Sequence, residues 1–107
     1  MKNLIRVSMA VLTFALLFAT SSFAADTGAD LYKANCASCH GASGAADTTM
    51  GKNLKLKDLG SGEVQKQSDA ELTTVVEKGK KPMPAYEGKL SKDQIQELVK
   101  YIRTLKK

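Results

Sequence analysis

Hydrophobic residues recur at helical spacing in two stretches of the second half of the chain. The first stretch begins with a capping box at Ser68 and ends at Gly79, with apolar residues at positions 72, 75 and 76. The second follows another capping box at Ser91, where Leu90 and Ile95 are placed to form a hydrophobic staple. Its apolar stripe is the clearest in the chain and comprises Ile95, Leu98, Val99, Ile102 and Leu105.

A third helix is predicted from about Thr27 to Cys39, with a weaker apolar stripe. Asp26 or Thr27 is suited to cap this helix, and Gly41 is suited to end it after His40. Residues 41–50 are rich in Gly, Ala and Thr and predict a loop. No stretch shows the alternation of a strand, so the pattern predicts an all-α fold with three main helices.

The first 24 residues have the pattern of a secretory signal peptide. Lys2 and Arg6 precede an apolar run over residues 7–19, and small residues occupy the two cleavage positions, Ser22 and Ala24. The alternative is a retained anchor, but the run is shorter than the roughly 20 residues that a spanning helix needs. We therefore expect residues 1–24 to be cleaved, and the mature protein to be periplasmic without stable membrane insertion.

Residues 25–107 leave one small domain, which we expect to be a monomer. The whole chain has 16 basic and 11 acidic residues, and two of the basic residues lie in the leader. The mature net charge is therefore 14 minus 11, or +3, which gives little support for a nucleic-acid partner. A domain of this size buries little apolar surface, so a bound cofactor would help it to fold.

The candidate chemistry is concentrated in Cys36-Ala37-Ser38-Cys39-His40. Cys-x-x-Cys-His is the attachment sequence of c-type haem, in which two thiols bind the porphyrin and the histidine reaches the iron. The chain has no other cysteine or histidine. A thioredoxin-like dithiol would need a preceding strand, and a structural zinc site would need four ligands. A disulfide between the two cysteines would leave His40 unexplained.

A second axial ligand is predicted at Met83. Pro82 and Pro84 exclude this residue from a helix and favour a stiff, extended loop that presents one sulfur. Methionine and histidine together raise the reduction potential of a haem relative to two histidines. Met83 as core filler and Met50 as the ligand are the alternatives; Met50 lies in a loop without flanking prolines, and we expect it to pack against the haem edge.

Together, residues 36–40, the Met83 loop and the last helix resemble a small soluble class I c-type cytochrome of the bacterial or algal monohaem kind. Gly28 and Tyr32 match the glycine and aromatic that this family places before its haem motif, and Leu98 and Tyr101 match residues of its C-terminal helix. The resemblance implies that residues 25–107 form a cytochrome c-like bundle around one covalently bound haem c. It also implies a close crossing of the first and last helices.

One departure from the family concerns the proximal histidine. Many members have a proline after the haem motif whose carbonyl accepts a hydrogen bond from the histidine ring, and no proline occurs here before Pro82. We therefore expect another backbone carbonyl, within residues 41–56, to orient His40.

Ligation at both axial positions leaves the iron no free site. We therefore expect an electron carrier, not an enzyme, that cycles between Fe(III) and Fe(II) with redox proteins as donor and acceptor. The alternative is a haem-based ligand sensor or weak peroxidase, if Met83 dissociates easily. Seven lysines are candidates for a basic rim that attracts an acidic docking surface: Lys52, Lys55, Lys57, Lys78, Lys80, Lys81 and Lys89.

Overall fold

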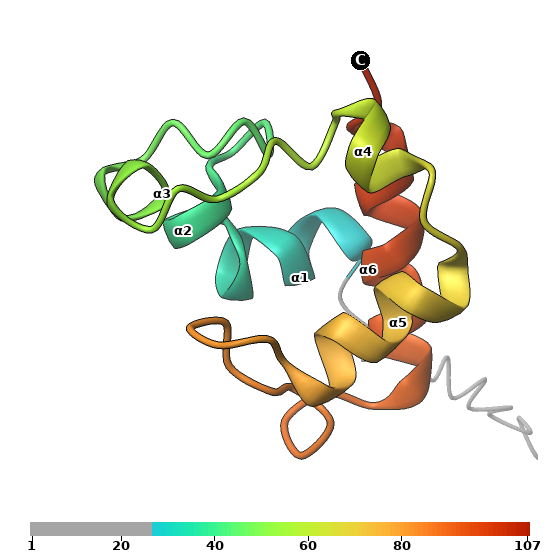
Figure 1. Cartoon of the computed structure of the whole chain (residues 1–107). Coiled ribbons are helices and arrows are strands. Elements are labelled where there is room, and N and C mark those ends of the chain that lie inside the picture. Colours follow the sequence, from blue (N-terminus) through green and yellow to red (C-terminus); the bar gives the residue numbers. More distant parts are fainter. Residues whose placement is uncertain (1–26) are drawn as a thin grey trace, which may run out of the picture.

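The last helix of the chain, α6, is the central element around which the others are arranged. The computed structural model describes residues 27–107, and the predicted signal peptide lies outside the described residues. Within that range the only sheet-like pairing is an isolated bridge between Lys80 and Met83, which confirms the all-α fold class. The helices are α1 (Gly28–Asn35), α2 (Ala37–His40), α3 (Thr49–Asn53), α4 (Gly62–Gln65), α5 (Asp69–Lys78) and α6 (Lys92–Thr104) (Figure 1).

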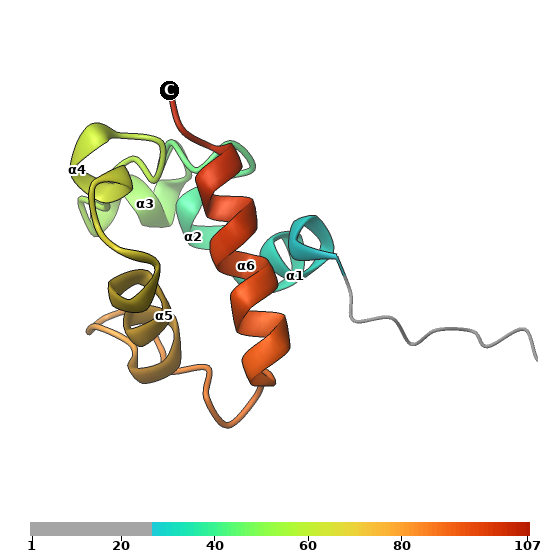
Figure 2. The ribbon, with the colours of Figure 1, turned by 90° about the vertical axis from the view of Figure 1, so that its right-hand side faces the viewer.

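Two clusters of buried side chains flank α6. One comprises residues of α1, α5 and α6: Leu31, Tyr32, Val76, Ile95 and Leu98. The other comprises residues of α4, α5 and α6: Val64, Leu72, Val99 and Ile102. The predicted apolar stripe of α6 therefore serves both clusters, and Figure 2 shows α6 passing between α1 and α5. None of the helices in residues 27–107 has the length and apolar character required to cross a bilayer.

The close crossing of α1 and α6 is present and depends on Gly28. A Cβ atom at this position would lie 2.4 Å from the carbonyl oxygen of Glu97, so only glycine permits this approach. Beside the crossing, the rings of Tyr32 and Tyr101 pack with centroids 5.0 Å apart and planes inclined by 47°. This crossing fixes the position of the C-terminal end of α1, and therefore of the haem motif that follows it.

The predicted helix from Thr27 to Cys39 is interrupted at Cys36. Thr27 caps α1, and Gly41 ends α2 with a φ of 83°, as expected. Between them Cys36 has a φ of −119°, which bends the chain while its amide still bonds to the carbonyl of Tyr32. The sequence prediction of one continuous helix was therefore wrong, because the bend depends on local backbone angles that apolar spacing does not report.

Two short helices, α3 and α4, were not predicted. Thr48 and Ser61 cap them by accepting hydrogen bonds from the amides of Gly51 and Val64. Each helix is about one turn long, too short for an apolar period to appear in the sequence. The loop predicted over residues 41–50 therefore ends at Thr48, and α3 begins at Thr49.

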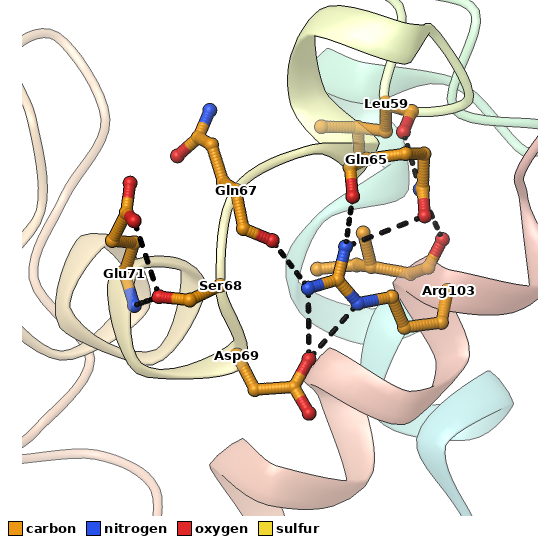
Figure 3. Close-up of polar contacts among 8 residues, drawn as sticks. Leu59, Gln65, Gln67, Ser68, Asp69, Glu71 and Arg103 are labelled. Atoms are coloured by element: carbon orange, nitrogen blue, oxygen red, sulfur yellow. Dashed lines mark hydrogen bonds and ion pairs between the residues drawn. The ribbon is translucent and has the colours of Figure 1, made fainter.

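The two longer helices begin with the predicted caps. Ser91 and Gln94 form a full capping box, whereas the Ser68 hydroxyl accepts from the amide of Glu71 and donates to its carboxylate. A side-chain network then joins the end of α6 to the α4–α5 connection (Figure 3). Arg103 donates to Asp69 Oδ1 at 2.9 Å and to the carbonyl oxygens of Gln65 and Gln67 at 2.8 and 2.5 Å.

Candidate haem-binding site

The junction of α1 and α2 presents both thiols and the imidazole of the motif within one turn. The amide of His40 donates to the carbonyl oxygen of Cys36 at 2.9 Å, which closes the turn. Cys36 and Cys39 are free thiols, and their side chains and that of His40 are half-buried. The disulfide considered from the sequence is therefore absent.

The pKa shifts in the motif argue against a catalytic dithiol and suit a histidine that binds a metal. Burial, with a smaller contribution from Cys39, raises the pKa of the Cys36 thiol to about 11. A catalytic dithiol needs the opposite shift, because only a lowered pKa supplies thiolate at neutral pH. Burial lowers the pKa of His40, so its imidazole is neutral near pH 7, as a metal ligand must be.

The orientation of His40 does not come from a hydrogen bond to its ring. Nδ1 is buried and has no hydrogen-bond partner, so the expected carbonyl of residues 41–56 does not serve this role. Carbonyls of that segment accept from other donors: Gly41 from Tyr32 Oη, and Gly44 from the amide of Leu59. The expectation was wrong because the atoms that surround the ring depend on how the chain folds around His40, which the sequence does not show.

Three consecutive carbonyl oxygens at the end of α2 are instead held by separate donors. Thr48 Oγ1 donates to that of Cys39 at 2.6 Å, and the amide of Ala46 donates to that of His40 at 2.8 Å. The buried hydroxyl of Tyr32 donates to that of Gly41 at 2.7 Å. The backbone that carries His40 is therefore fixed from α1, from the following loop and from the start of α3.

Residues 79–86 form a tightly folded loop that presents Met83. The amides and carbonyls of Lys80 and Met83 bond to each other, at 2.7 and 3.2 Å. Gly79 has a φ of 72°, and a Cβ atom there would lie 2.7 Å from the carbonyl oxygen of Met83. The loop also returns to α5, since the amide of Tyr86 donates to the carbonyl of Val76 at 3.0 Å.

Tyr86 ties this loop to the haem motif. Its hydroxyl donates to the carbonyl oxygen of Asn35 at 2.9 Å, one residue before Cys36. Burial, followed by the nearby thiols of Cys36 and Cys39, raises the pKa of Tyr86, so the hydroxyl keeps its proton. Sequence reasoning missed this residue; its only signal was an aromatic three positions after a proline-flanked methionine.

The structure places Met83 and Cys36 against the same core. Both are partly buried and pack on the cluster that contains Tyr32 and Leu98. In Figure 1 the loop of residues 79–86 lies below α2, and Figure 2 shows the same arrangement from the side. Met50 differs, because its side chain is 49% exposed on α3. Met83 is therefore the methionine that shares a packing environment with the motif.

All seven lysines of the expected basic rim are exposed, but three of them have partners. Lys57 pairs with Glu63 and Lys78 with Glu87, while Lys89 lies over the ring of Tyr86. The other four take part in no ion pair among the described residues: Lys52, Lys55, Lys80 and Lys81.

The donor set fits a covalently bound haem. Two free thiols, one neutral imidazole and one thioether are the kinds of group that c-type haem uses for its two covalent links and two axial ligands. A zinc site fits less well, because no three His, Cys, Asp or Glu side chains of residues 27–107 gather as metal ligands.

Comparison with known proteins agrees with this chemistry. The family model described as cytochrome C oxidase, cbb3-type, subunit III matches residues 23–102. The cytochrome c6 of Nostoc sp. (strain PCC 7120) is 38% identical over 103 residues, covering 94% of this chain and 87% of the relative. The cytochrome c6 of Picosynechococcus sp. (strain PCC 7002) is 33% identical, covering 95% of this chain and 92% of the relative.

Solved structures show the same fold. The KustC0563 c-type cytochrome superposes with a TM-score of 0.71 at 30% identity, covering 77% of this chain and all of that one. Cytochrome c6C from Synechococcus sp. PCC 7002 superposes with a TM-score of 0.59 at 32% identity, covering 74% and 93%. The chain therefore belongs to the c-type cytochrome family and is an electron-transfer protein that carries covalently bound haem c.

Proposed function

We propose that Cys36 and Cys39 hold the haem through thioether bonds and that His40 and Met83 are its axial ligands. The observation that carries this assignment is the hydrogen bond from Tyr86 to the carbonyl of Asn35, which ties the Met83 loop to the haem motif. Bound haem supplies one-electron chemistry at iron. The protein's part is to hold four side chains in one arrangement in both oxidation states, which keeps reorganisation small.

We further propose that the protein acts outside the cytoplasm as a monomeric carrier and not as a catalyst. Electrons would pass through an exposed haem edge to and from redox proteins. Four lysines without ion pairs, in α3, directly after it and in the Met83 loop, favour partners with an acidic docking surface. The alternative of a ligand sensor or weak peroxidase is not favoured, because it needs a labile Met83 and the loop is held at both ends.

Carbon monoxide binding to the reduced holoprotein tests the ligand assignment. Met83→Ala should open the sixth position, so this variant binds carbon monoxide readily whereas the wild type does not. Met50→Ala is the matched control and should behave like the wild type, because its side chain is exposed on α3. If only the Met50 variant bound carbon monoxide, Met50 and not Met83 would be the axial ligand.

A further inference from the structure

A metal-bound histidine is ordinarily oriented by a hydrogen bond from its second ring nitrogen. In this chain Nδ1 of His40 is buried and lacks an acceptor, so no such bond fixes the rotation of the ring. The ring must then be directed by the backbone to which it is attached. What holds that backbone becomes the determinant of how the imidazole is presented.

Thr48 makes the bond that joins this backbone to α3. Its hydroxyl donates to the carbonyl oxygen of Cys39 at 2.6 Å and accepts from the amide of Gly51 at 2.8 Å. One hydroxyl therefore caps α3 and also forms a hydrogen bond to the residue that precedes His40. The hydrogen bond from Thr48 to Cys39 is part-buried, which limits competition from water.

Gly51 lets α3 approach α2 closely enough for this hydrogen bond to form. A Cβ atom at this position would lie 2.7 Å from the carbonyl oxygen of Cys39 and 2.6 Å from that of Ala46. The first turn of α3 therefore rests directly on the backbone of α2.

We propose that Thr48 is a positioning residue for the haem ligand His40, acting through its hydrogen bond to the Cys39 carbonyl. The proposal rests on the assignment of His40 as an axial ligand. Removing the hydroxyl leaves the carbonyl of Cys39 without its donor and removes the hydrogen bond that joins the start of α3 to α2. The backbone that carries His40 would then be held less firmly, and the imidazole would be presented to the haem in a different orientation.

The test compares Thr48→Val and Thr48→Ser in the oxidised holoprotein. Valine keeps the branched shape without the hydroxyl, and serine keeps the hydroxyl. The readout is the pattern of haem-methyl NMR shifts, which depends on the orientation of the axial ligand planes, together with the reduction potential. We expect Thr48→Val to redistribute the shifts and move the potential, and Thr48→Ser to retain the wild-type pattern.

Thr74→Val is the matched control, because Thr74 also donates to a carbonyl oxygen, that of Ala70 at 2.9 Å, but lies on the exposed side of α5. It should leave the shift pattern unchanged. A wild-type pattern in Thr48→Val, or an altered pattern in Thr48→Ser, would overturn the proposal. If valine prevents the holoprotein from accumulating, Thr48→Ala takes its place, with the same expected and contradicting outcomes. Failure of the ligand assignment would appear separately, as a wild-type protein without histidine-ligated haem.

Discussion

Single hydrogen bonds to backbone carbonyls connect the parts of the candidate haem site. Tyr32, Thr48 and Tyr86 each place a hydroxyl on the carbonyl oxygen of a residue in or beside the haem motif. Burial holds the pKa of Tyr32 well above its usual value, so this hydroxyl also stays a donor. Carbonyl acceptors suit this role because their positions follow the backbone and are independent of side-chain rotamers.

Tyr86→Phe should loosen the Met83 loop without changing the ligands. The substitution leaves the carbonyl of Asn35 without its partner, and a lost hydrogen bond of this kind costs about 1 kcal/mol of unfolding free energy. We also expect the reduced variant to bind carbon monoxide faster than the wild type. Chemical denaturation and carbon monoxide mixing measure the two effects.

Tyr101→Phe serves as the control for the loss of a tyrosine hydroxyl. Tyr101 packs beside Tyr32 at the crossing of α1 and α6, away from the Met83 loop. It should leave carbon monoxide binding at the wild-type rate. Equal carbon monoxide binding by the Tyr86 and Tyr101 variants would contradict a role for Tyr86 in holding the loop.

At the scale of elements, the crossing of α1 and α6 sets the position of the haem motif. α1 contacts α6 through Gly28 at its first turn and through Tyr32, four residues before Cys36. Arg103, near the C-terminal end of α6, plays a corresponding role for the connection between α4 and α5 (Figure 3). The central helix is therefore fixed to both halves of the chain.

Gly28→Ala should force α1 away from α6. Its Cβ atom would meet the backbone oxygen of Glu97 at 2.4 Å, and backbone cannot yield as a flexible side chain does. Overpacking of this kind costs roughly 1–3 kcal/mol, which denaturant unfolding of the holoprotein would measure. Gly62→Ala, where a Cβ atom meets nothing within 4 Å, is the control, and an equal loss in both variants would contradict the steric explanation.

At the scale of the whole molecule, the four lysines of the expected rim that lack an ion pair belong to two segments that lie on one side. α3 carries Lys52, the residues after it include Lys55, and the Met83 loop carries Lys80 and Lys81. Figure 1 shows α3 and this loop on the same side of the bundle as α2. A negatively charged reactant should therefore be attracted to the side where the haem motif lies.

The charge on this side can be tested with ferricyanide, an anionic oxidant. We expect Lys80→Gln combined with Lys81→Gln to slow oxidation of the reduced protein at low salt, with a smaller difference at high salt because ions screen the attraction. Stopped-flow mixing measures both rates. Lys92→Gln combined with Lys100→Gln removes the same charge from α6 and should have little effect. Equal slowing by the two double variants would indicate that the rate depends on the net charge of the protein and not on where the charge lies.

Local chemistry made α5, α6 and the haem motif predictable. Capping serines, terminal glycines and apolar spacing involve residues that are close together in the sequence, so these signals can be recognised from the sequence alone. The position of Met83 outside a helix was also predictable, because two prolines beside one methionine exclude a helix. Its role as an axial ligand stays a prediction. The bend at Cys36 and the short helices were missed, since a single turn leaves no periodic signal.

The sequence by itself determined that this protein is all-α and carries covalently bound haem, and it predicted Cys36–His40 as the attachment site. Tertiary structure alone decided how the site is held together. The bonds from Tyr86 to Asn35 and from Tyr32 and Thr48 to the end of α2 join residues separated by 51, 9 and 9 positions. Such bonds form only when the folded chain brings these residues together. Because the buried Nδ1 of His40 has no partner of its own, the position of this residue depends on the bonds that hold its backbone.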